Sequence, residues 1–166
     1  MGVGDMSIST ISGSHAPTDV LDSALCRRVE LQASAKEFAQ ALAEPHWGNE
    51  GVWLDAVNVA LRALRQDIEE HIAVTESSAG LHKEIITAQP RLANKVQHLG
   101  ADHEVLMDRT SSMIIMSDRS FNAPTEQGIA ALRDEAHLII ELLARHRQRS
   151  ADLLYEAYTF EIGDGD

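Results

Sequence analysis

Apolar residues recur along most of this chain at alternating steps of three and four positions, which is the pattern of a helix with one buried face. The strictest example continues without a break from Leu54 to Thr75 and includes His71. Comparable stripes of apolar residues, here called seams, occur in three other long segments. The predicted helices and one short helical turn (81–88) cover 17–43, 51–76, 81–88, 90–116 and 126–159.

Residues that favour turns separate these segments. Pro45 to Asn49, Ser77 to Gly80 and Asp118 to Pro124 are rich in Pro, Gly, Ser or Asn, which interrupt helices. Four helices with one apolar seam each predict an all-α fold, an antiparallel four-helix bundle over 17–160. Residues 1–16 are rich in Gly, Ser and Thr and are predicted to form a disordered tail, and 161–166 an acidic C-terminal end.

Charge and composition narrow the range of partners. The 166 residues include 26 acidic and 14 basic ones, for a formal net charge of −12. Such a surface repels phosphate backbones and anionic lipids, so neither nucleic acid nor a membrane is an expected partner. A single cysteine excludes an intrachain disulfide, and neither a secretory signal nor an apolar stretch of membrane-spanning length is visible. We therefore expect a cytoplasmic protein.

Three histidines occupy seam positions, one on each of the last three long helices: His71, His103 and His146. Each alone is typical of a core histidine that a neighbouring carbonyl or carboxylate satisfies. Three buried imidazoles in one small bundle, however, share a large desolvation cost. A divalent metal ion would offset that cost for all three, since neutral imidazole is a good ligand for iron, zinc, nickel or copper. Whether the three lie at one level cannot be predicted, because the loops leave the register open.

The other histidines are predicted to take no part in this cluster. His137 and Glu141 form a His-x3-Glu pair, but helical geometry places both on the solvent face of their helix. His98 is predicted to share an outer face with Lys95 and Asp102. The remaining three fall in the tail or in connecting segments: His15, His46 and His82.

One inward histidine per helix resembles the hemerythrin-like, or HHE cation-binding, domains. The resemblance covers about 50–160 and is carried by Asp-Ile-Glu-Glu-His71 and by His146-Arg-Gln-Arg-Ser-Ala-Asp-Leu-Leu-Tyr-Glu-Ala-Tyr. It implies a di-iron centre, with ligands on all four helices. This chain departs from that pattern: the first helix has no histidine and places Arg28 on its inner stripe. Thr75 and Ser150 stand where further ligands are expected, and Glu76 lies one residue late.

With those ligands missing, a mononuclear three-histidine site is the more natural metal hypothesis. His71, His103 and His146 would be ligands, and Glu76 a fourth ligand or an outer hydrogen-bond acceptor. The resemblance makes iron the first expectation, with zinc or nickel as alternatives, and a diatomic molecule (oxygen or nitric oxide) or peroxide as the ligand. DinB-type bundles, which group three histidines around one ion, are also similar, although their paired histidines on one helix are absent.

The competing hypothesis is a metal-free helical interaction protein that has lost the ancestral site. Arg28 favours this alternative, because a guanidinium facing the cluster opposes a bound cation. A homodimer is compatible with either hypothesis.

Overall fold

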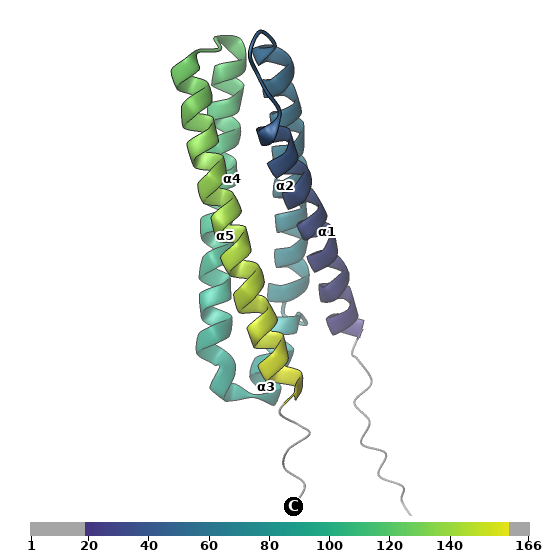
Figure 1. Cartoon of the computed structure of the whole chain (residues 1–166). Coiled ribbons are helices and arrows are strands. Elements are labelled where there is room, and N and C mark those ends of the chain that lie inside the picture. Colours follow the sequence, from purple (N-terminus) through teal and green to yellow (C-terminus); the bar gives the residue numbers. More distant parts are fainter. Residues whose placement is uncertain (1–18, 160–166) are drawn as a thin grey trace, which may run out of the picture.

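The computed structural model describes residues 19–159, and within them every regular element is helical (Figure 1). The predicted all-α class is therefore confirmed. The predicted tail over 1–16 and acidic end over 161–166 lie outside the described residues. The elements are α1 (Asp19–Ala43), α2 (Glu50–Glu76), α3 (Leu81–Ala88), the 3-10 helix η1 (Pro90–Leu92), α4 (Ala93–Asn122) and α5 (Glu126–Thr159).

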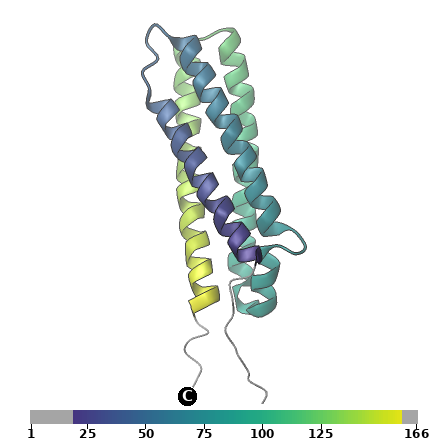
Figure 2. The ribbon, with the colours of Figure 1, turned by 90° about the vertical axis from the view of Figure 1, so that its right-hand side faces the viewer.

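The four long helices form an up-down-up-down bundle (Figures 1 and 2). Helices α1 and α2, α2 and α4, and α4 and α5 pack closely as neighbours, while α1 and α5 pack less closely. The short α3 lies at the end of the bundle where α2 is connected to α4, beside the end of α5 (Figure 1). This arrangement leaves the least crowded side of the bundle between α1 and α5.

The predicted seams of α2 and α4 are buried throughout, from Leu54 to Thr75 and from Leu92 to Met113. On α1 the stripe is displaced, because Leu25 is 39% exposed while Ala24 is buried. Ala24 is in step with the buried α1 residues that follow it, whereas Leu25 is one residue out of step. Apolar side chains are thus concentrated on one face, and no helix within 19–159 combines the length and apolar character needed to cross a membrane.

Helix α4 is longer than predicted. The sequence indicates an end near residue 116 and a loop over 118–124, but α4 continues to Asn122. Ser117 is fully buried on this extra turn, and the carboxylate of Asp118 pairs with Arg62 and accepts a hydrogen bond from Asn58 of α2. These contacts with α2 therefore stabilise the last turn of α4, where the local sequence favours a turn.

Candidate metal centre

The bundle brings His71, His103 and His146 to one level. A short loop joins the end of α4 to the start of α5. His103 and His146 lie at the same distance from that loop along their helices, to within one residue, so they face each other. Helix α3 and η1 separate α2 from α4, so that His71, near the end of α2, meets His103, further along α4. All three side chains are buried, with 2–4% of their surface exposed.

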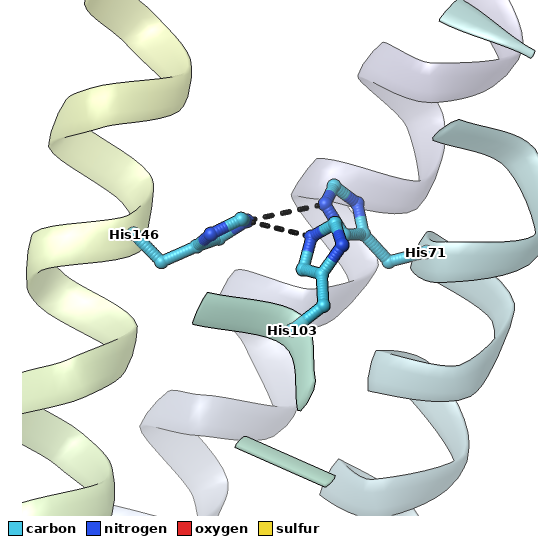
Figure 3. A group of neighbouring side chains, drawn as sticks. All are labelled: His71, His103 and His146. Atoms are coloured by element: carbon cyan, nitrogen blue, oxygen red, sulfur yellow. Dashed lines mark hydrogen bonds between the residues drawn. The ribbon is translucent and has the colours of Figure 1, made fainter. Parts of the chain in front are cut away.

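The three rings converge from three helices (Figure 3). The Nε2 atom of His146 lies 3.3 Å from Nε2 of His103 and 3.3 Å from Nε2 of His71. Each ring offers a nitrogen within 4.8 Å of the other two, and this is the one group of at least three potential metal ligands found within residues 19–159. Two nitrogens bound to a tetrahedral zinc-sized ion at about 2.0–2.1 Å are about 3.3 Å apart. Both contacts of His146 match that spacing.

Burial keeps the three rings neutral. Burial, together with the neighbouring His103 and His146, lowers the pKa of His71 to about 3. It lowers the pKa of His146 and of His103 to about 4, although the charge of Asp102 acts in the opposite direction on both. At pH 7 the rings therefore carry no charge, which is the form that binds metal ions.

Hydrogen bonding alone cannot satisfy this arrangement. A neutral imidazole nitrogen carries either one proton or one lone pair. The proton of His103 is held on Nδ1 by Glu76, so its Nε2 presents a lone pair to His146. If Nε2 of His146 carries a proton, that one proton is shared between Nε2 of His103 and Nε2 of His71. If instead Nε2 of His71 donates to His146, the lone pairs of His103 and His146 face each other at 3.3 Å. A cation at the point of convergence would accept all three lone pairs.

Glu76 lies behind the ligand set. Its Oε1 atom is 2.5 Å from Nδ1 of His103, on the side of the ring away from His146. Helix α2 is a regular α-helix through Glu76, so the carboxylate reaches His103 without a bulge in the helix. Of the two predicted roles, this position fits the outer acceptor, which orients a histidine and makes its other nitrogen a stronger ligand.

Two further residues were missed by sequence reasoning. Asp102 was assigned to an outer face, but its side chain is only 16% exposed, pairs with Arg149 and lies 3.8 Å from Nδ1 of His146. His82 was assigned to a connector, but it is a buried residue of α3 whose ring stacks on His103 at 5.9 Å between centroids. Asp102 directly precedes the seam residue His103, and this adjacency was a usable signal that Asp102 lies near the cluster. No local feature of the sequence indicated that α3 would pack against the cluster.

Helix α1 contributes no ligand and instead places Arg28 near the rings, where its charge further lowers the pKa of His71 and His146. Arg28 also lines a cavity of about 300 Å³ that reaches His71 and His146 from the side of α1 and α5. Two hydroxyl side chains stand where the sequence resemblance implied further ligands: Thr75 donates to the backbone oxygen of His71, and Ser150 lines the cavity. The available donors are therefore three imidazoles.

Among the other histidines of residues 19–159, His98 and His137 are exposed and His46 lies in a loop, as predicted, while His82 differs. His137, Glu141 and His98 are all exposed. His46 is buried in the loop between α1 and α2, where its Nδ1 is 3.1 Å from a guanidinium nitrogen of Arg133. His15 lies outside the described residues.

Comparison of the chain with protein-family models, with curated proteins and with solved structures finds no match.

Proposed function

We propose that this bundle binds one divalent metal ion through the Nε2 atoms of His71, His103 and His146. The observation that carries the proposal is the position of His146, whose Nε2 atom lies 3.3 Å from two other buried imidazole nitrogens. Without an ion, the lone pairs of neutral rings at this spacing repel each other or compete for one proton. With an ion, all three rings can act as ligands.

A mononuclear centre fits the donors better than a di-iron centre. Two ions need bridging carboxylates to offset their charge. Glu76 is hydrogen-bonded to the outer nitrogen of His103, and Asp102 is paired with Arg149, so neither carboxylate bridges the inner face. The proposed relation to hemerythrin-like domains is accordingly one of bundle and histidine positions, with a reduced ligand set.

Two carboxylates lie behind the ligand histidines and offset the cationic groups nearby. Arg28 opposes a bound ion and Arg149 is paired with Asp102, but Glu76 and Asp102 each lie near the outer nitrogen of a ligand histidine. A carboxylate hydrogen-bonded to the outer nitrogen of a ligand histidine, as Glu76 is, orients the ring and stabilises a bound metal ion. This contact supports the metal proposal over the metal-free alternative.

Iron is the metal that the resemblance to the HHE family implies, while zinc and nickel suit the same three imidazoles. Three protein ligands leave a tetrahedral ion with one open position. Since α2, α4 and α5 would supply the ligands, that position would face α1 and the cavity that reaches His71 and His146. A small ligand such as oxygen, nitric oxide or peroxide would bind there.

The test is elemental analysis of untagged protein purified without chelator, both under nitrogen and under air. We expect one ion per chain in the wild type and in the His98→Ala variant, which removes an exposed histidine. His146→Ala should carry little metal, because it removes the ring shared by both close contacts. A wild-type protein without iron, zinc or nickel would reject the proposal and leave the metal-free interaction bundle.

A further inference from the structure

The cavity between α1 and α5 is larger than a diatomic ligand requires. Its volume is about 300 Å³, whereas a water molecule occupies about 30 Å³ in the liquid. The cavity lies at the low end of the range of sites that hold small organic molecules, about 300–1,000 Å³. It lies on the side of the bundle where the helices pack least closely. The space therefore fits an organic molecule better than oxygen or nitric oxide.

The charged residues that line the cavity are all cationic. Arg28, Lys36 and Arg147 line it, and no carboxylate from residues 19–159 does. None of the three makes an ion pair within those residues, although Arg27 next to Arg28 pairs with both Glu30 and Glu70. On a chain of net charge −12, three cations that line one cavity without an ion pair in the described part of the chain create a local site for an anion.

Two of the cations, Arg28 and Arg147, lie together at the histidine end of the cavity, while Lys36 lies further along α1. Because α1 and α5 are antiparallel, Arg28 is level with Arg147, and its guanidinium lies 3.5 Å from the backbone oxygen of that residue. His71 and His146 line the same cavity, and the charge of Arg28 contributes to the lowered pKa of both. The rest of the wall is mainly apolar: Leu31, Ala35, Ile140, Leu143 and Ala144.

We propose that this cavity binds a small organic monocarboxylate with a hydrocarbon body. The carboxylate lies beside Arg28 and Arg147, next to the histidines, and the body extends along the apolar wall toward Lys36. A guanidinium binds a carboxylate through charge-assisted hydrogen bonds, and the apolar wall favours the hydrocarbon. This inference rests on the proposed function in one respect: when the metal is bound, the carboxylate occupies its open position.

The experiment is calorimetric titration of octanoate into metal-free and zinc-loaded protein, with 1-octanol as the uncharged ligand of the same length. We expect octanoate to bind both forms, the zinc-loaded form more tightly, and in each form about tenfold or more tightly than octanol. The double variant Arg28→Gln, Arg147→Gln should lose that preference. Arg119→Gln, Arg145→Gln removes the same charge from exposed positions outside the cavity and should retain it.

A steric variant tests the apolar part of the cavity. Ala144→Phe places a larger side chain at the apolar wall, and should abolish octanoate binding while leaving zinc content unchanged. Equal binding of octanoate and octanol, or equal losses in the two double variants, would overturn the inference while leaving the metal proposal standing. Failure to load zinc would instead reject the metal proposal, and octanoate binding to the metal-free protein would still decide whether the cavity recognises carboxylates.

Discussion

The Nδ1 atom of His103 lies 2.5 Å from Oε1 of Glu76, and this contact determines which nitrogen of the ring carries the lone pair. An ionised carboxylate only accepts hydrogen bonds, so Nδ1 donates and Nε2 is left free to bind a cation. Asp102 lies on the corresponding side of His146, 3.8 Å from its Nδ1 atom. One of the three proposed ligands, His103, is thus oriented by a hydrogen bond to a carboxylate, and a second, His146, has a carboxylate nearby on the same outer side.

Replacing Glu76 by Gln should weaken metal binding without removing it. The amide can still accept from Nδ1 of His103 but carries no charge, so we expect an affinity about 10–100-fold lower at unchanged stoichiometry. Competition with a chelator of known affinity measures this change. Glu141→Gln, an exposed carboxylate on α5, is the matched control. Identical affinities for the wild type and Glu76→Gln would argue against the orienting role.

The stability of the metal-free protein should depend on pH. The pKa of His71 is lowered to about 3 and those of His82, His103 and His146 to about 4, from an ordinary value of 6.5. Between these values the unfolded chain binds more protons than the folded one. The free energy of unfolding should therefore fall by several kcal/mol as the pH falls from about 6.5 to about 4.

Urea unfolding of the metal-free protein at several pH values in this window measures that dependence. The variant His71→Leu should show a shallower dependence, because it removes one of the buried titrating rings at an apolar position of similar volume. A free energy of unfolding that stays constant across the window would mean that the rings can take up protons without unfolding.

The exposed pair His137 and Glu141 should be dispensable. Replacing both by Ala should change the free energy of unfolding by less than about 0.5 kcal/mol, because neither side chain is buried. Metal content should also be unaltered. Loss of metal in this double variant would show that the conspicuous His-x3-Glu spacing, and not the seam, marks the ligands.

The fold could be predicted because its information is local and repeated. Helical spacing of apolar residues places Leu61 and His71 on one face of α2 whatever the neighbouring helices do. One error lay in the period itself, because Leu25 is one residue out of step with the buried stripe of α1. Another arose where tertiary contacts prevail: α4 continues past residue 116 through contacts of Asp118 with α2. Such pairings between distant residues leave no periodic trace in the sequence.

The candidate site was predictable in its inner part only. The seam identified His71, His103 and His146, but their common level depends on loop lengths and on how α3 fits between α2 and α4. Glu76 was found because of the family resemblance. His82 was missed because its burial against His103 depends on how the short helix α3 docks onto the bundle. The spacing of residues within α3 does not indicate that docking.

The three proposed ligands should behave as one unit. If they share an ion, replacing any one by Ala should sharply reduce metal occupancy, and the second replacement should cost much less stability than the first. Thermal or urea unfolding of the single and double variants of His71 and His103, with His98→Ala as the control, measures the coupling. Additive changes in a protein without metal would fit three separate core histidines, for which His→Leu would be neutral or stabilising.

The most direct test of the central claim is X-ray absorption at the zinc edge of protein that has been stripped of metal and supplied with one equivalent of Zn²⁺. We expect a single tightly held ion with three imidazole nitrogens at about 2.0–2.1 Å and one further oxygen or nitrogen ligand in the open position. In His146→Ala this signature should disappear. Zinc that stays in solution, or that is bound by carboxylate oxygens in place of His71, His103 and His146, would contradict it.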